Sequence, residues 1–157
     1  MYAVENECGP TGLVLTRQNL PQIEGSSKDA LKGGYVIAES EKAVPDAIII
    51  ASGSEVSLAI NAKEELKKSG IDVRVVSMPS MELFDKQSAE YKESVLPNGV
   101  RKRVAVEALS DFGWYKYVGL DGRVIAMEGF GASATLFEHF GFTVDNVVKT
   151  VKEVVNA

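Results

Sequence analysis

The stretch AIIIASGSEVSLAINAKEELKKSGIDVRVVS, residues 47–77, decides the fold. It opens with Ala47–Ala51, a continuous apolar run between polar residues, which is typical of a strand covered on both faces. A helix is predicted to follow Ser52–Glu55 and to run to about Ser69, because apolar residues recur there at helical spacing until Gly70 ends the pattern. Val73–Ser77 is the next predicted strand. The stretch therefore has the strand–helix–strand order from which parallel sheets are built.

Strands and helices continue to alternate on both sides of this unit. The further segments are bounded by turn or capping residues, with strands predicted at Gly34–Glu39, Val104–Ala108 and Val124–Met127 and helices at Met81–Asp85, Ser88–Leu96, Phe112–Val118, about Thr135–Phe140 and onward from the cap Thr143. This alternation predicts an α/β fold. We expect a three-layer α/β/α sandwich around a mostly parallel sheet of roughly five strands.

The composition is that of one soluble globular domain. A length of 157 residues suffices to bury a core, and 45% hydrophobic with 25% charged residues argue against disorder. The net charge of −5 disfavours nucleic acid as a partner, and the one basic cluster, Arg101–Arg103, is expected to form a solvated turn. No signal peptide and no apolar run of roughly 20 residues is present, so no membrane partner is expected. Cys8 is the single cysteine; we expect it to be inert, in a reducing compartment such as the cytoplasm.

The first 25 residues do not continue the alternating pattern. Leu13–Leu15 is an apolar run with strand character, but such a short run needs partner strands to stay in a sheet. Pro21 and Gly25 then mark a linker. If the partner strands belong to another domain, these first residues should be poorly anchored in this chain.

Three places in the sequence carry candidate site residues. Arg17 follows the first apolar run, and its guanidinium is a planar fork of donors that suits phosphate oxygens. The segment Ser52–Glu55 has the S-x-x-E spacing of a capping box, which favours a helix cap over an anion site. Glu107 lies at the carboxyl end of a predicted strand, where ligands gather in open α/β sheets. A hydrogen-bonded structural role is favoured there over proton transfer, because the sequence places no ionisable partner beside it.

Other candidates are interpreted as structural. The loop Gly129–Ser133 is glycine-rich but lacks the G-x-G-x-x-G order, so a tight turn is favoured over a phosphate cradle. His139 has no second ligand at metal-site spacing and is predicted to lie on a helix surface. Trp114, Tyr115 and Tyr117 are expected in the core or at an interface rather than stacked on a ligand.

Several of these segments together resemble the transketolases. LTRQNLPQIEGSS, residues 15–27, is similar to the region that joins the pyrimidine-binding and C-terminal domains in that family, and ASGSEVSLA, residues 51–59, to its T-G-S-E-V motif. Further segments that match the family are Gly33–Val36, Phe84–Gln87, Tyr91, Val95–Pro97, Gly113–Trp114 and Phe130–Ser133. Each is short, and the resemblance depends on their common order and spacing. After the last segment this chain has a shorter loop than is usual in the family.

The resemblance implies a division of the chain. Residues 1–25 would be the tail of a preceding pyrimidine-binding domain with its linker, and residues 26–157 the transketolase C-terminal α/β domain. In the family the arginine of the R-Q-N motif helps bind the substrate phosphate, which implies that role for Arg17 in the parent enzyme. The family is homodimeric. It moves two-carbon ketol units between sugar phosphates with thiamine diphosphate and a divalent metal, Mg²⁺ or Ca²⁺.

The family's cofactor motifs are not found in this chain. Its metal is held by a G-D-G motif, whereas here Asp121–Gly122 follow a leucine. The glutamate that activates the cofactor belongs upstream in the family. We therefore expect no catalytic, cofactor or metal residue here, and neither cofactor binding nor turnover by the chain alone. Its expected role is structural, in dimer assembly or in regulation, with the remaining transketolase domains as partners.

Two alternatives stay open on the residues alone. One is a stand-alone α/β module that binds a small ligand or regulates another protein. The other is a free-standing enzyme that uses Glu107 or Arg17. Residues 1–25 discriminate between them and the transketolase interpretation, because a stand-alone module has no need of an isolated strand and an R-Q-N motif.

Overall fold

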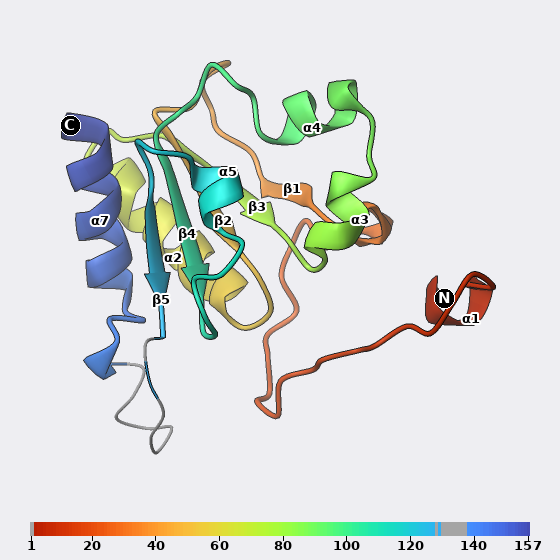
Figure 1. Ribbon diagram of the computed structural model, residues 1–157. Coiled ribbons are helices and arrows are strands. Elements are labelled where there is room, and N and C mark those ends of the chain that lie inside the picture. The colour runs from red at the N-terminus through yellow and green to blue at the C-terminus, as the bar shows by residue number, and fades with distance from the viewer. Residues whose placement is uncertain (1, 128, 130–137) are drawn as a thin grey trace.

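In the computed structural model, which describes residues 2–127, 129 and 138–157, five strands form one sheet (Figure 1). The strands are β1 (Tyr35–Ala38), β2 (Ala47–Ala51), β3 (Val73–Ser77), β4 (Arg103–Glu107) and β5 (Arg123–Ala126). Their order across the sheet is β1-β3-β2-β4-β5. β1 runs antiparallel to β3, and the other neighbours are parallel. The predicted, mostly parallel sheet is confirmed, and its antiparallel strand lies at one edge.

Helices cover both faces of the sheet (Figure 1). They are the 3-10 helix η1 (Lys28–Lys32), α2 (Glu55–Lys68), α3 (Met81–Asp85), α4 (Ala89–Val95), α5 (Tyr115–Val118) and α7 (Val144–Asn156). The short helix α1 (Tyr2–Glu5) lies apart from the sheet, near the N-terminus (Figure 1). α2 and α7 pack together on one face, whereas α3, α4 and α5 contribute to the hydrophobic cluster on the other. The three-layer sandwich is therefore confirmed. Among the described residues, no helix is long and apolar enough to cross a membrane.

The central strand β2 supplies both hydrophobic clusters. Ile49 belongs to the cluster with α2 and α7, whereas Ile48 and Ile50 belong to the cluster on the opposite face. All three side chains are fully buried. Burial on both faces explains why this strand has an unbroken apolar run instead of an alternating pattern.

Most element boundaries fall within one residue of the predicted ones. Ser88 and Thr143 cap α4 and α7 through their hydroxyl oxygens, as predicted. The helix predicted for residues 112–118 is shorter, because α5 begins only at Tyr115. Gly113 has a φ of 89°, a conformation that a helix does not contain, so the chain turns before the helix starts.

The first 22 residues extend away from the sandwich (Figure 1). Leu13–Leu15 forms no strand; its side chains are between 71% and 92% exposed and belong to neither described hydrophobic cluster. The chain joins the core at Ile23, which packs against the α2 and α7 cluster. Two residues later, Gly25 has a φ of 89°, and a Cβ atom there would lie 2.2 Å from the Ile37 carbonyl oxygen. The junction between segment and sandwich thus requires a glycine at residue 25.

Candidate functional site

A hydrogen-bonded carboxylate lies at the carboxyl edge of the sheet. Glu107 ends β4, and Ser52 follows the neighbouring strand β2. The Ser52 hydroxyl donates to Glu107 Oε2 over 2.8 Å, and the Leu109 backbone N–H and Trp114 indole N–H also donate to this carboxylate. The prediction that Glu107 is hydrogen-bonded is confirmed. Its partner Ser52 was not identifiable from sequence, because only the strand order places β2 beside β4.

A second carboxylate lies close to this edge. Glu55 is only 4% exposed, and its Oε1 accepts a hydrogen bond of 2.5 Å from the Ser54 hydroxyl. Burial raises the pKa of the Glu107 carboxyl, and the negative charge of Glu55 acts in the same direction. The hydrogen bonds that Glu107 accepts favour its ionised form and oppose this rise only in part. Glu107 therefore holds a proton at a higher pH than an exposed glutamate does.

The capping box predicted for Ser52 and Glu55 is wrong. The N-cap of α2 is Ser54, whose side chain makes no capping hydrogen bond, and the Ser52 hydroxyl donates to Glu107. A backbone bond joins the two predicted partners instead, because the Glu55 N–H donates to the Ser52 carbonyl over 3.1 Å. With a buried carboxylate in its first turn, this helix start does not suit an anion.

Replacing Glu107 with glutamine tests the raised pKa. An acid whose pKa is higher in the folded state contributes stability that is present below its unfolded pKa and is lost as pH rises through its folded pKa. The stability of the wild type relative to Glu107→Gln should therefore fall as pH rises from about 4, near the pKa of an unperturbed glutamate, through the higher folded-state pKa of Glu107. Urea unfolding at a series of pH values measures it. Glu90→Gln is the control, because the pKa of the Glu90 carboxyl is lowered by local hydrogen bonds and its effect has the opposite sign. A pH-independent difference for Glu107→Gln would contradict the assignment.

Arg17 lies in the segment that precedes the sandwich. Its side chain is exposed, and in the described part of the chain no residue pairs with it. The local turn is held by the Gln18 N–H, which donates to the Thr16 hydroxyl oxygen over 3.2 Å. Cys8, in the same segment, is exposed and not in a disulfide. The structure does not bring Arg17 and Glu107 together, since one lies in the extended segment and the other in the sheet.

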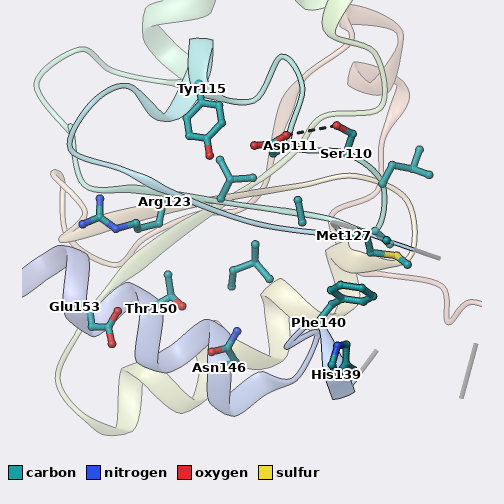
Figure 2. Close-up of a pocket in the computed structure, with 16 residues that line it drawn as sticks. Ser110, Asp111, Tyr115, Arg123, Met127, His139, Phe140, Asn146, Thr150 and Glu153 are labelled. Atoms are coloured by element: carbon teal, nitrogen blue, oxygen red, sulfur yellow. Dashed lines mark hydrogen bonds between the residues drawn. The ribbon is translucent and has the colours of Figure 1, made fainter. Parts of the chain in front are cut away.

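A groove of about 1090 Å³ runs along the edge strand β5 (Figure 2). Asp111 and Tyr115 lie on one side of the strand, and Phe140, Asn146 and Thr150 lie on the other (Figure 2). Sequence reasoning missed this groove. Its lining comes from separate segments that only the strand order brings together, so no local pattern marks it.

Two of the sequence candidates border the groove. His139 is exposed, as predicted for a surface residue, and its ring lies 5.0 Å from that of Phe140. Gly129 lines the groove, but the rest of the loop Gly129–Ser133 and most of the helix predicted at Thr135–Phe140 lie outside the described residues. Within the described ranges, no three His, Cys, Asp or Glu side chains gather as metal ligands.

The aromatic residues near α5 divide between core and surface. Trp114 and Tyr117 are 2% and 5% exposed, with ring centroids 6.4 Å apart, so the prediction of core positions is confirmed for both. The Tyr117 hydroxyl donates to Asp85 Oδ1 over 2.9 Å, and burial together with this carboxylate raises the pKa of Tyr117. Tyr115 is 58% exposed and borders the groove.

The basic cluster Arg101–Arg103 is not uniformly solvated. Arg101 is exposed and pairs with Asp121 over 2.5 Å, as a solvated turn predicts. For Arg103 that prediction is wrong, because β4 begins at this residue. Its half-buried guanidinium donates hydrogen bonds of 2.7 to 3.1 Å to carbonyl oxygens, those of Leu96, Pro97, Val100 and Tyr117. Burial lowers the pKa of Arg103.

The sheet order, the antiparallel edge strand and the two helical layers define an α/β sandwich domain. The family model described as the transketolase-like TK C-terminal domain matches residues 33–143 of the chain. The chain therefore belongs to the family of transketolase C-terminal domains, as the sequence resemblance implied.

Whole transketolases are similar to the chain over almost all of its length. The transketolase of Bacillus subtilis (strain 168) is 55% identical over 161 residues, which cover 98% of this chain and 24% of that protein. The transketolase structure from Leishmania mexicana has a TM-score of 0.80 and 44% identity, covering 89% of this chain and 20% of its own. The Pichia stipitis transketolase in complex with sedoheptulose-7-phosphate has a TM-score of 0.81 and 46% identity at the same coverage. The chain thus spans about a quarter of the length of the Bacillus subtilis transketolase.

Proposed function

We propose that this chain is the C-terminal part of a transketolase and has a noncatalytic role in it. Residues 1–25 are the end of the pyrimidine-binding domain with its linker, and residues 26–157 are the C-terminal domain. The observation that carries the proposal is the similarity across 98% of the chain, which extends into the segment before the sandwich. The domain packs against the remaining transketolase domains and supports homodimer assembly, in the cytoplasm.

Arg17 is proposed as a phosphate ligand in the parent enzyme. Its guanidinium is exposed, and no described residue forms a hydrogen bond or an ion pair with it. A planar guanidinium binds phosphate oxygens through two parallel hydrogen bonds. The substrates are proposed to be sugar phosphates, in keeping with the bound sedoheptulose-7-phosphate of the Pichia stipitis enzyme. In the parent enzyme Leu13–Leu15 would be a strand that holds the arginine in place.

The described residues do not fit a site for thiamine diphosphate and its metal. Asp121 follows Leu120 instead of a glycine, and its carboxylate pairs with the exposed Arg101. Glu107 is committed to hydrogen bonds with Ser52, the Leu109 amide and the indole of Trp114. We therefore propose that the cofactor and its Mg²⁺ or Ca²⁺ bind to the remaining domains of the parent enzyme.

Recombining the chain with the separately produced remaining domains tests the proposal. The chain alone should neither bind thiamine diphosphate tightly in calorimetry nor transfer ketol units, and the mixture should transfer them.

In the mixture, Arg17→Ala should raise KM for the sugar phosphate at least about tenfold, because charged hydrogen bonds contribute about 1.5–3 kcal/mol each. Arg101→Ala, another exposed arginine, is the control and should leave KM unchanged. Turnover by the chain alone would overturn the noncatalytic role.

A stand-alone ligand-binding or regulatory module is the second candidate. The groove along β5 favours it, since a volume of about 1090 Å³ is large enough for a small molecule. In that case the isolated chain should be stabilised against heat by a small ligand, and Thr150→Arg, a change on the groove wall, should abolish that effect.

A further inference from the structure

Large apolar side chains are exposed in and beside the loop between β4 and α5, residues 108–114. Leu109 is 66% exposed and Phe112 is 88% exposed, and Tyr115, where α5 begins, is 58% exposed. Clustered apolar exposure of this kind marks a contact surface, whereas single exposed residues are ordinary. The other exposed large hydrophobic residues that the structure describes after residue 22 are separate from this cluster in the sequence; they are Leu31, Val44 and Leu120.

The exposure does not come from a loosely held loop. The Leu109 backbone N–H donates to the Glu107 carboxylate, and the Leu109 carbonyl oxygen accepts from the Met127 N–H over 2.9 Å. At the other end of the loop, the indole N–H of the buried Trp114 donates to the same carboxylate. The backbone is thus tied to the sheet while Leu109 and Phe112 stay exposed. A surface whose shape is already fixed loses little conformational entropy when a partner docks.

The loop lies at the edge of the sheet where the chain also enters it. It follows the carboxyl end of β4, and β2, β3 and β5 run in the same direction as β4. β1 begins beside the end of β3, because Tyr35 pairs with Ser77. In Figure 1 the extended segment of residues 1–22 runs off on the side to which the arrows of β4 and β5 point. A domain attached through this segment therefore approaches the carboxyl edge of the sheet.

The proposed function supplies the occupant of this surface, and the inference rests on that function. In it, most of the parent enzyme lies outside this chain, because the chain covers 24% of the Bacillus subtilis transketolase. The connection from Leu15, in the proposed last strand of the preceding domain, to Ile23 reaches at most about 28 Å when fully extended. The preceding domain is therefore held close to the carboxyl edge, whereas a second copy of the chain has no such tether.

We propose that the loop of residues 108–114 docks on the pyrimidine-binding domain that precedes it in the parent enzyme, with Leu109 and Phe112 as the apolar anchors. Each anchor is removed from water in this contact, which favours association. Glu107 is a positioning residue for the contact, because it binds the Leu109 amide and the Trp114 indole at the two ends of the loop. The surface opposite the anchors is apolar.

Binding of the chain to the separately produced remaining domains, measured by calorimetry, tests the proposal. Leu109→Lys and Phe112→Lys should each raise the Kd at least about tenfold, which corresponds to about 1.4 kcal/mol. Leu120→Lys is the matched control, because Leu120 is 94% exposed but precedes the amino end of β5, and it should leave the Kd unchanged. Since all three side chains are exposed, the variants should unfold at the same urea concentration as the wild type.

The outcomes separate this inference from the proposed function. If the wild type binds and all three variants bind equally well, or lose affinity equally, the docking surface is elsewhere while the proposed function stands. If the wild type does not bind, both are wrong. A dimer of the chain alone that Phe112→Lys disrupts would show that the surface pairs two copies, and the inference would then be wrong.

A fluorescent probe locates the contact. In a Cys8→Ser background, Phe112→Cys carries an environment-sensitive dye, whose emission should shift to shorter wavelength when the remaining domains are added, because the centre of an interface excludes water. The same dye on Leu120→Cys should not shift. Equal shifts at the two positions, or no shift at residue 112 in a mixture that transfers ketol units, would contradict docking through this loop.

Discussion

Replacing Trp114 with alanine is expected to lower the free energy of unfolding by about 3–5 kcal/mol. The indole is 2% exposed and packs against Tyr117, so its removal leaves a cavity beneath α5. The indole N–H also donates to Glu107, which would lose a donor while it stays half-buried. Urea unfolding followed by circular dichroism measures the change, because Trp114 is the single tryptophan and the variant has no tryptophan fluorescence.

Two further variants separate the causes of this loss. Trp114→Phe keeps an aromatic ring but removes the donor, and should cost about 1–3 kcal/mol. Tyr115→Ala alters the next aromatic residue, which is 58% exposed, and should cost no more than about 0.5 kcal/mol. Equal losses for Trp114→Ala and Tyr115→Ala would show that the indole does not hold α5 to the sheet.

Arg103→Ala is expected to lower the free energy of unfolding by about 2–3 kcal/mol. The guanidinium ties the loop after α4 to α5, since it donates to carbonyl groups in both regions. Without it, these carbonyl oxygens lose a charged donor in a partly buried position. Arg103→Lys should restore only part of the stability, because an ammonium group cannot match the planar fork.

The neighbouring Arg101 provides a control of the same residue type. It is exposed, and its pair with Asp121 is at the surface. Arg101→Ala should therefore change the free energy of unfolding by less than about 1 kcal/mol. If the two alanine variants lost the same stability in urea, the bonds of Arg103 to the carbonyl groups would not be stabilising the domain.

Sequence patterns predicted the fold well where burial is continuous. Ala47–Ala51 and Val73–Ser77 match β2 and β3 residue for residue. All five residues of β2 are buried and apolar, and the three valines of β3 are fully buried, so both runs stand out from the polar segments beside them. The prediction failed at α5, where Gly113 delays the helix start. It also failed at Arg103, since a charged residue can enter a strand when backbone carbonyl oxygens accept hydrogen bonds from it.

The candidate site was less predictable than the fold. The position of Glu107 at a strand end was predictable, but its bond to Ser52 depends on β2 and β4 being neighbours. The S-x-x-E spacing was misleading, because α2 begins at Glu55 with Ser54 as its N-cap, which leaves Ser52 before the helix, where its hydroxyl donates to Glu107. Arg17 could be interpreted only through its motif, since its side chain is exposed and makes no hydrogen bond or ion pair with a described residue.

The junction at Ile23 and Gly25 has a consequence for how this gene could be rearranged. Every buried side chain of the described sandwich lies after it in the sequence. A gene fusion or fission just upstream of Ile23 would leave the buried residues of the sandwich unchanged. The transferred sequence would have to include Ile23, which packs against the core, and Gly25, which lies against Ile37.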